Sequence, residues 1–278
     1  MKNIVVLYHA DCPDGFSGAW IAQKKLGNKA EYIPVYYHLP PPPGLKNKEI
    51  YLIDFTFPSE LIKKLIKENK KVVIIDHHIT SEERVKLAKE YLFNTNHSGA
   101  MLAWRYFYKN KPAPRLIKYI EDMDLWRFRL PYTAEIISFI EIFDFNFKNW
   151  DKLSRDLESP AERKEIIKQG KIIERYEDRV IERIIREDAE AVKFAGYKTL
   201  AVNTQFSHSK LGNVLVKRMP PISITWTQRG KQRFFSLRSD GSVNVGELAK
   251  RFPGGGGQKG AAGFSLPTDK PLPWKPIK

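Results

Sequence analysis

The sequence predicts an α/β protein. Its N-terminal part is expected to be a doubly wound, mainly parallel sheet, and its C-terminal part a smaller mixed-sheet α/β domain. Three observations lead to this prediction. Short runs of β-branched and aliphatic residues alternate with amphipathic helical stretches over the first 130 residues. Several of these runs are apolar throughout, which is typical of parallel strands covered on both faces. Strand-like runs return after Gly196, following a long segment with a helical pattern.

Residues 1–130 are expected to form the first domain, in which strands and helices alternate. The expected strands are the apolar runs Ile4–Tyr8, Glu31–Tyr37, Ile50–Ile53 and Val72–Ile75. The expected helices are Phe16–Leu26, Ser59–Glu68, Ser81–Tyr91 and Gly99–Tyr108, with a further helical stretch ending in Glu121–Trp126. Ser98 directly precedes one of these helices and is a residue type that commonly caps a helix start.

Residues 131–195 are expected to form a helical connector, and residues 196–278 a basic substrate-binding domain. A long charged helix should run from Ser159-Pro160 to about Ala195, because apolar residues recur there at helical spacing. We interpret it as a solvated connector, with a homodimer contact as the alternative. The last domain is expected to contain the strands Thr199–Thr204, Ile222–Gln228 and Arg233–Leu237 and the helices Lys210–Met219 and Val243–Phe252.

The 278-residue chain has the composition of a soluble globular protein, with 42% hydrophobic and 28% charged residues. No membrane span is expected, because no run of about eighteen uninterrupted apolar residues occurs. The N-terminus lacks a signal-peptide pattern, and Cys12 is the single cysteine. Both features favour a cytoplasmic location.

The net charge of +15 is concentrated in the C-terminal domain. Residues 196–278 carry 14 Lys and Arg against 3 Asp and Glu, whereas the first 195 residues carry 33 against 29. A basic domain beside a nearly balanced one indicates a polyanionic partner. The charge alone is equally compatible with a lysine-rich surface that keeps the protein soluble.

Acidic and imidazole side chains gather where three of the expected strands end. The first strand is followed by His9, Asp11 and Asp14, the third by Asp54, and the fourth by Asp76, His77 and His78. In open α/β sheets, ligands bind just beyond the carboxyl ends of such strands. So many carboxylates require a counter-charge, and mixed Asp and His ligands suit Mn²⁺, Fe²⁺, Co²⁺ or Zn²⁺. About five to seven candidate ligands are better explained by two cations than by a single cation. A pair of cations can support the displacement of a phosphoryl group.

Each of these residues taken alone has a simpler interpretation. A single Asp at a strand end is usually a helix cap, and a single His is usually a satisfied core residue. The coincidence of three strand ends argues against that reading for the set.

A second candidate site is the glycine-rich loop near the C-terminus. Consecutive glycines leave backbone N–H groups able to approach an anion closely, and the loop lies in the most basic segment. A flexible turn is the alternative reading. The candidate phosphate-binding residues are Arg238, Gly255, Gly256, Gly257, Gln258 and Lys259.

Together these motifs resemble the DHH phosphoesterase family with its DHH-associated C-terminal domain, over nearly the whole chain. The resemblance rests on the tripeptide Asp76-His77-His78, on the segment HADCPDG at residues 9–15, and on the glycine-rich loop. The family includes nanoRNA-degrading oligoribonucleases, phosphatases of 3′-phosphorylated adenosine nucleotides, dinucleotide phosphodiesterases, RecJ-type exonucleases and family II pyrophosphatases.

The resemblance implies a centre of two Mn²⁺ ions, with Mg²⁺ or Co²⁺ as alternatives. One ion would be bound by His9, Asp11 and Asp54. The other would be bound by Asp14, Asp54 and His77, so that Asp54 bridges the pair.

Further roles follow from the same resemblance. One more acidic ligand is expected at Asp122, with Asp124 as the fallback. His78 would contact the scissile phosphate, Asp76 would orient the two histidines, and Ser98 would belong to the substrate-binding set.

Two positions depart from the family pattern. The acidic turn is one residue longer than usual, which makes Asp11 the least secure ligand. Cys12 lies nearer the expected register, and a thiolate there would favour a softer metal. The glycine loop continues into Gln258 where the family has His, so phosphate binding is expected to be weaker there or to shift to Lys259.

The expected function is a Mn²⁺-dependent phosphodiesterase that hydrolyses short oligonucleotides or dinucleotides, with the basic domain gripping the nucleotide across an interdomain cleft. One alternative is a phosphomonoesterase acting on a nucleotide such as 3′-phosphoadenosine 5′-phosphate. The other is a nucleic-acid-binding scaffold with a vestigial metal site. The basic domain and Gln258 favour a scaffold, whereas the intact set of His9, Asp14, Asp54 and His77 argues against it.

Overall fold

The computed structural model describes residues 2–36, 39–109 and 111–277. The chain divides into two compact units, one ending at Arg175 and the other beginning at Tyr176. Our finer division at residues 130 and 195 stays a prediction. Every helix in the described residues is too short or too polar to span a bilayer.

The first unit is built on a five-stranded sheet in the order β2-β1-β3-β4-β5, and all of its strand pairs are parallel. The predicted parallel sheet is therefore confirmed. Its strands are β1 (Ile4–His9), β2 (Ala30–Val35), β3 (Glu49–Ile53), β4 (Lys71–Asp76) and β5 (Glu90–Phe93). The expected end of the second strand at Tyr37 lies outside the described residues.

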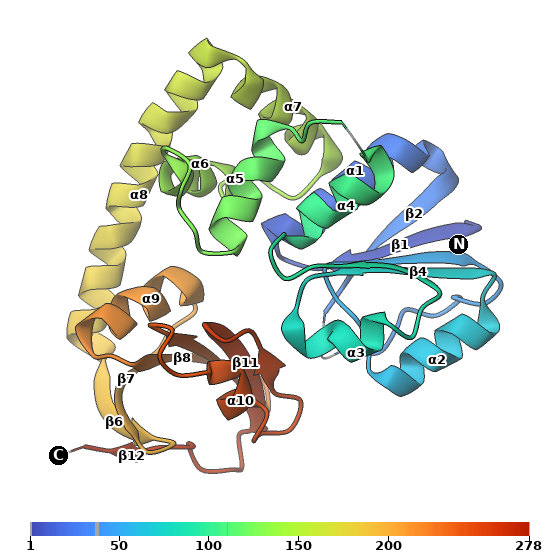
Figure 1. Cartoon of the computed structure of the whole chain (residues 1–278). Coiled ribbons are helices and arrows are strands. Elements are labelled where there is room, and N and C mark those ends of the chain that lie inside the picture. The colour runs from blue at the N-terminus through green and yellow to red at the C-terminus, as the bar shows by residue number, and fades with distance from the viewer. Residues whose placement is uncertain (1, 37–38, 110, 278) are drawn as a thin grey trace. The chain divides into compact units, whose positions relative to one another are not determined.

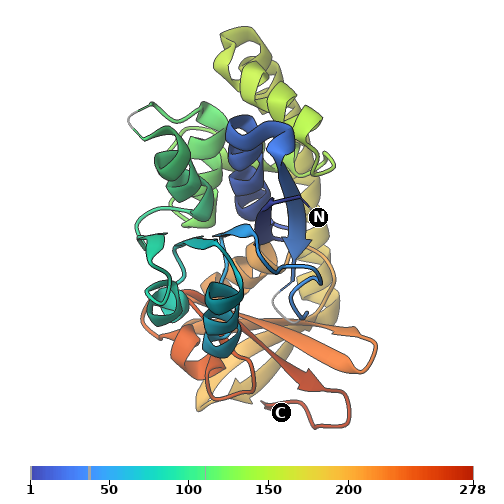
Figure 2. The same cartoon turned by 90° about the vertical axis from the view of Figure 1, so that its right-hand side faces the viewer.

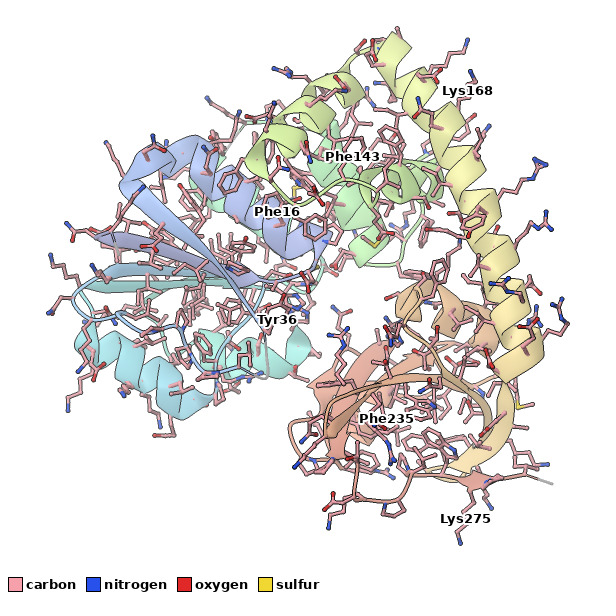
Figure 3. The ribbon with its side chains drawn as sticks, turned by 180° about the vertical axis from the view of Figure 1, so that it is seen from behind. Phe16, Tyr36, Phe143, Lys168, Phe235 and Lys275 are labelled. Atoms are coloured by element: carbon pink, nitrogen blue, oxygen red, sulfur yellow. The ribbon has the colours of Figure 1, made fainter. Side chains whose placement is uncertain are left out.

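Helices cover both faces of this sheet (Figure 1). Along β1, Val6 points to one face, and Val5 and Leu7 point to the other, so successive residues enter different cores. The first face packs against helices that include α1 (Pro13–Leu26), α4 (Gly99–Tyr108), α5 (Arg115–Asp124), α6 (Thr133–Ile140) and α7 (Phe147–Glu158). The second face packs against α2 (Ser59–Glu68) and α3 (Glu82–Val85). Figure 3 shows Phe16 and Phe143 among the side chains that pack on the first face of the sheet.

The helix predicted over Ser81–Tyr91 is wrong for most of its length. A 3-10 turn (Ile79–Ser81) and the four-residue helix α3 occupy its start, and β5 begins at Glu90. Strand formation wins here because β4 would otherwise expose an unpaired edge. Glu90 also ties the new strand in place, since its carboxylate lies 2.8 Å from Lys71 Nζ and accepts a hydrogen bond from the Tyr106 hydroxyl.

Helix α8 (Pro160–Asp188) crosses the boundary between the units. Its residue Ile166 packs into the core of the first unit, whereas Ile181 and Ile185 pack with Val202 and Leu211 of the second. The helix ends at Asp188, earlier than the predicted Ala195, because residues 190–194 form strand β6. Ala195 and Gly196 both have positive φ, 50° and 95°, as in the tight turns that join two antiparallel strands.

The second unit is a seven-stranded sheet in the order β10-β11-β9-β8-β7-β6-β12. Its pairs are antiparallel except for β7 with β8, which confirms the predicted mixed sheet. Figure 2 shows the hairpin of β8 and β9 in orange. The remaining bounds are β6 (Glu190–Phe194), β7 (Tyr197–Asn203), α9 (His208–Arg218), β8 (Ile222–Arg229), β9 (Gln232–Ser239), α10 (Val245–Ala249), β10 (Gly256–Gly257), β11 (Ala261–Pro267) and β12 (Lys275–Pro276).

Candidate metal centre

The site lies at one edge of the parallel sheet, where β1, β3 and β4 end side by side. The register pairs Tyr8 with Ile53 and Ile53 with Ile75, so the residues that follow these strands emerge together. Asp54 is the central one of them. Its backbone N–H donates to the Ile75 carbonyl at 2.9 Å, and its φ is 65°, an angle uncommon outside glycine. The left-handed backbone ends strand β3 at the site.

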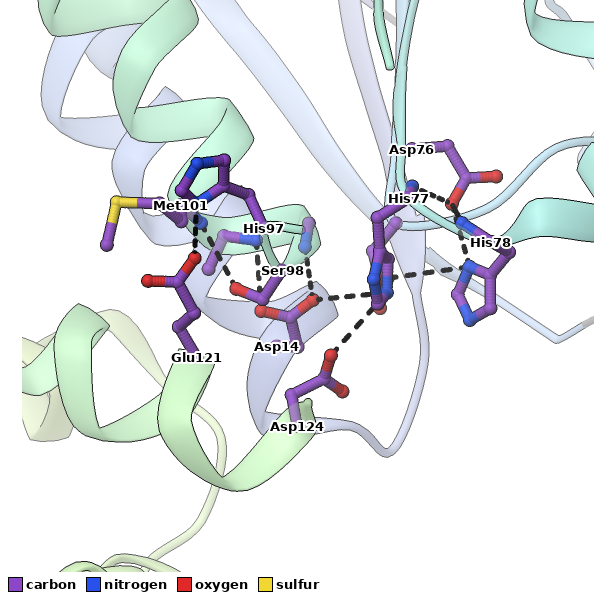
Figure 4. Close-up of polar contacts among 12 residues, drawn as sticks. Asp14, Asp76, His77, His78, His97, Ser98, Met101, Glu121 and Asp124 are labelled. Carbon is purple, nitrogen blue, oxygen red and sulfur yellow. Dashed lines mark hydrogen bonds and ion pairs between the residues drawn. The ribbon is translucent and has the colours of Figure 1, made fainter. Parts of the chain in front are cut away.

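Imidazoles from the two neighbouring strands approach the buried Asp54 carboxylate, which is 1% exposed. His9 Nδ1 lies 3.3 Å from Asp54 Oδ2, and His77 Nε2 lies 3.3 Å from Asp54 Oδ1. His77 Nε2 is also 3.5 Å from Asp124 Oδ2 and 4.0 Å from Asp14 Oδ2 (Figure 4). Asp54 thus presents one oxygen toward each of the two histidines.

Three groups of potential ligands overlap within this cluster, each with its ligand atoms within 4.8 Å of one another. These groups are His9–Cys12–Asp54, Asp54–His77–His78 and Asp14–His77–Asp124. Because Asp54 and His77 are shared between groups, the arrangement fits two adjacent cations better than one isolated ion. The mixed carboxylate and imidazole donors suit Mn²⁺, Fe²⁺, Co²⁺ or Zn²⁺.

The electrostatics of the cluster also fit bound cations. Burial raises the pKa of Asp14 well above its usual value, and the nearby Asp124 and Asp54 raise it further. Burial likewise raises the pKa of Asp124. Within the part of the chain that the structure describes, neither ring nitrogen of His77 has a hydrogen-bond partner of acceptable geometry. Buried polar atoms that lack such partners are costly, and ligation to a cation would satisfy Nε2, the ring nitrogen that faces the carboxylates of the cluster.

Histidines whose pKa is raised compensate part of the negative charge of the cluster. Burial opposes a charge on His77, but Asp54 and Asp124 outweigh it and raise the pKa of His77 to about 10. Burial would raise the pKa of Asp54 as well, but the adjacent imidazoles of His77 and His9 hold it well below its usual range. Divalent cations would replace these protons.

Asp76 lies behind the cluster and holds the histidine pair in place. Its Oδ1 accepts from the backbone N–H of His77 at 2.7 Å and of His78 at 3.2 Å, and lies 2.7 Å from His78 Nδ1. Its Oδ2 accepts from the Ser81 hydroxyl. Burial opposes a charge on His78, but the adjacent Asp76 carboxylate raises its pKa. The orienting role that the resemblance implies for Asp76 stays a prediction, and these contacts are consistent with it.

The preference for Asp122 over Asp124 is reversed. Asp122 Oδ1 accepts from Arg129 N at 3.0 Å, while its Oδ2 accepts from Leu130 N at 3.0 Å and from Thr133 Oγ1 at 2.6 Å. These bonds fasten the loop after α5, so Asp122 faces away from the histidines. Asp124, two residues further along the helix, is the residue beside His77.

Asp11 and Cys12 have exchanged the expected roles. Asp11 has φ 50°, is exposed, and accepts a hydrogen bond from the Tyr36 hydroxyl at 2.9 Å. The expectation that Asp11 belongs with the ligands is therefore corrected. Cys12 instead lies with His9 and Asp54. Burial raises the pKa of the Cys12 thiol well above its usual value, and the carboxylates of Asp54, Asp124 and Asp14 raise it further.

Ser98 is not placed to bind substrate. Its side chain is fully buried and caps helix α4 by accepting from Met101 N at 3.3 Å, as its position before the helix predicts. It also hydrogen-bonds Asp14, whose two oxygens accept from Gly99 N at 2.6 Å and Ala100 N at 3.0 Å. The start of α4 therefore positions Asp14 (Figure 4), a role that the sequence reasoning missed.

The glycine-rich segment forms a compact hairpin and not an open cradle. Gly255 N donates to Phe252 O at 3.0 Å, and Gln258 N donates to Ala261 O at 2.7 Å. A Cβ at Gly255 would lie 2.0 Å from Ala249 O, so close backbone packing by itself explains a glycine there. Gly256 and Gly257 form β10 and pair with β11.

The two basic residues near this hairpin, Arg238 and Lys259, differ in their exposure and contacts. Arg238 Nη2 donates to Ser209 Oγ at 2.6 Å and Nη1 donates to Ser236 Oγ at 2.9 Å, and burial lowers the pKa of Arg238 to about 10. Lys259 is exposed, and its backbone carbonyl accepts from Val245 N. Phosphate binding by Arg238, Lys259 and residues 255–258 stays a prediction.

Comparison with known sequences gives one relative whose function is itself not described. No family model matches the chain. An uncharacterized protein of Acanthamoeba polyphaga mimivirus is 29% identical over 287 residues, which cover 94% of this chain and 67% of that protein.

Two solved structures resemble the chain along almost its full length. The DHH domain of a member of a ribosomal protein family has a TM-score of 0.58 and 14% identity, covering 99% of this chain and 83% of that one. RecJ from Thermus thermophilus in complex with Mn²⁺ has a TM-score of 0.56 and 15% identity, covering 95% of this chain and 49% of RecJ. The chain therefore has the fold of DHH-domain proteins, and the fold expected from the resemblance is confirmed.

Proposed function

We propose that this chain is a metal-dependent phosphoesterase that hydrolyses phosphodiester bonds in short oligonucleotides or dinucleotides, with Mn²⁺ as its activating ion. The observation that carries the proposal is the convergence of His9, Asp14, Asp54, His77 and Asp124 at one sheet edge. The fold, shared with a RecJ solved with Mn²⁺, is consistent with it.

Asp54 would bridge the two cations, because its two oxygens face His9 on one side and His77 on the other. Asp14, His77 and Asp124 would complete the second position. When bound, a pair of cations there would supply activation of a water for attack on phosphorus and would stabilise charge on the phosphoryl oxygens. The start of α4 keeps Asp14 in place through the backbone N–H groups of Gly99 and Ala100.

His78 would act on the substrate directly. Its side chain is 24% exposed, whereas that of His77 is 1% exposed. The adjacent Asp76 carboxylate raises the pKa of His78 and so favours its protonated form. Held by Asp76 at Nδ1, the ring would donate from Nε2 to a phosphoryl oxygen and stabilise the charge that develops there.

The nucleotide part of the proposal rests on charge. The C-terminal 83 residues carry 14 basic against 3 acidic side chains, and such an excess favours a polyanionic ligand over a small neutral one. We expect this unit to contribute the binding energy that selects nucleotides, while the first unit carries the chemistry.

An assay over a substrate panel tests this function. Metal-free protein should gain activity on 5′-pNpN dinucleotides and short oligomers when Mn²⁺ is added, with less on longer strands, cyclic dinucleotides and 3′-phosphoadenosine 5′-phosphate. Asp54→Ala should abolish the activity, and the exposed Asp11→Ala should keep most of it. Activity on the bisphosphate nucleotide alone would make the protein a phosphomonoesterase. Undiminished activity of Asp54→Ala would overturn the proposal.

A further inference from the structure

The turn between β1 and α1 brings a sulfur atom into the metal centre. Asp11 has a left-handed backbone, with φ 50°, and this turns its carboxylate toward the Tyr36 hydroxyl. Cys12 then takes an extended conformation, with φ −133° and ψ 127°, immediately before Pro13 begins the helix. Of these two residues, Cys12 is the one whose side chain lies beside His9 and Asp54.

Cys12 is not an isolated thiol. Its Sγ, a ring nitrogen of His9 and an oxygen of Asp54 all lie within 4.8 Å of one another. A second observation points to a ligand on the other side of Asp54, at the neighbouring position. The His77 side chain is 1% exposed and directs Nε2 at the same Asp54 carboxylate, 3.3 Å from Oδ1, yet neither of its ring nitrogens makes a hydrogen bond within the described residues.

From this geometry we infer that Cys12 is a thiolate ligand of the cation at His9 and Asp54, so that this position prefers Co²⁺, Zn²⁺ or Fe²⁺ to Mg²⁺. The inference rests on the proposed metal centre and adds to it a preference among metal ions. Thiolate is a soft ligand that favours such metals, whereas carboxylates suit Mg²⁺ and Mn²⁺. When the sulfur–metal bond forms, the thiol proton passes to solvent.

The two cation positions would therefore differ in chemistry. The position at His9, Cys12 and Asp54 offers nitrogen, sulfur and oxygen donors. The position at Asp14, His77 and Asp124 offers one nitrogen and two carboxylates, which remains suited to Mn²⁺. We expect a mixed centre, with the softer metal held more tightly.

Cobalt spectroscopy tests the thiolate directly, because Cys12 is the only cysteine of the chain. Metal-free wild-type protein titrated with Co²⁺ should develop a near-ultraviolet thiolate-to-cobalt charge-transfer band in addition to the visible ligand-field bands. Cys12→Ser should lose the charge-transfer band and keep visible bands from the second position. Asp11→Ala, which changes the neighbouring residue outside the cluster, should keep both.

The outcomes separate this inference from the proposed function. Visible bands without a charge-transfer band in the wild-type protein would overturn the thiolate ligand and leave the metal centre standing. Absence of any cobalt binding by spectroscopy and calorimetry would overturn the metal centre and the proposed function together. The wild-type spectrum alone decides the ligand, even if Cys12→Ser fails to fold.

Competition calorimetry tests the selectivity. Cys12→Asp replaces sulfur by oxygen at the same place, and we expect it to shift the preference for Co²⁺ over Mg²⁺ by at least about tenfold toward Mg²⁺. An unchanged ratio would contradict a sulfur ligand.

Discussion

Asp54 and Asp76 are both buried aspartates at strand ends, but their partners give them different roles. Asp54 lies between two imidazoles and faces the other carboxylates, which is where a cation is needed. Both oxygens of Asp76 are instead in hydrogen-bond contact with backbone N–H groups, with His78 and with Ser81. The two residues are of the same type, so their surroundings decide that Asp54 is a candidate cation ligand and that Asp76 holds the neighbouring histidines in place.

The Asp76–His78 pair gives a pH prediction for the metal-free protein. In the wild type the carboxylate outweighs burial and raises the pKa of His78 above 6.5. Asp76→Asn removes the carboxylate but leaves the burial, so the pKa of His78 should fall below 6.5. Imidazole NMR titration measures it, with His97 in the same spectrum as the internal control. A His78 pKa unchanged by the substitution would show that Asp76 does not set it.

The same pair contributes stability within a pH window. The folded-state pKa of Asp76 is lowered, so this contribution is lost as the pH falls through the pKa of Asp76. The folded-state pKa of His78 is raised, so the contribution is also lost as the pH rises through the pKa of His78. Asp76→Asn should therefore flatten the dependence of the melting temperature on pH at both ends.

Asp122 and Asp124 provide a matched pair of substitutions. Asp122→Ala should destabilise the fold by about 2–3 kcal/mol, because it leaves two backbone N–H groups without their acceptor and the Thr133 hydroxyl with only the Leu130 carbonyl. Asp124→Asn should not destabilise the metal-free protein, because burial already disfavours its charge, but it should weaken cation binding.

Urea unfolding and calorimetry of both variants measure the two effects. The reverse result, with stability lost at Asp124 and cation affinity lost at Asp122, would restore the ligand assignment made from the sequence. The sequence could not decide between these positions, because residues two apart on a helix face nearly opposite sides and the spacing does not say which side meets the sheet edge.

At the scale of elements, the start of α4 supports two carboxylates of the candidate metal centre. A Cβ on Gly99 would lie 2.6 Å from Asp54 Cβ and 2.9 Å from Asp14 Oδ2. Gly99→Ala should therefore displace both carboxylates and weaken cation binding by about 10–100-fold, the usual cost of disturbing groups that orient ligands. Calorimetric titration with Mn²⁺ measures it.

Gly260→Ala is the matched control, because a Cβ there meets no atom within 4 Å. We expect its cation affinity to equal that of the wild type. Equal affinities for wild type and Gly99→Ala would mean that α4 does not hold the site in place.

Elements with a clear pattern were predictable and those decided by tertiary contacts were not. The apolar runs of β1, β3 and β4 identified three strands correctly. Glu90–Phe93 and Glu190–Phe194 lie in segments with helical composition, and each became a strand because a neighbouring strand offered it an open edge.

At the scale of the whole molecule, one topological rule accounts for most of what could be predicted. Parallel strands that are neighbours end at the same edge, so His9, Asp54 and His77 could be grouped from their positions after apolar runs. Which side chains in the loops face that edge could not be predicted, because the left-handed backbone of Asp11 has no clear signal in the sequence. The glycine-rich segment misled for a related reason, since glycines there also permit close packing of backbone.

Calorimetric titration of Mn²⁺ into the metal-free chain, comparing wild type with Asp54→Asn, tests whether one carboxylate holds two cations. We expect two ions per wild-type chain and loss of tight binding of both in the variant, because Asp54 would serve both positions. Two ions bound by the variant with wild-type affinity would contradict it.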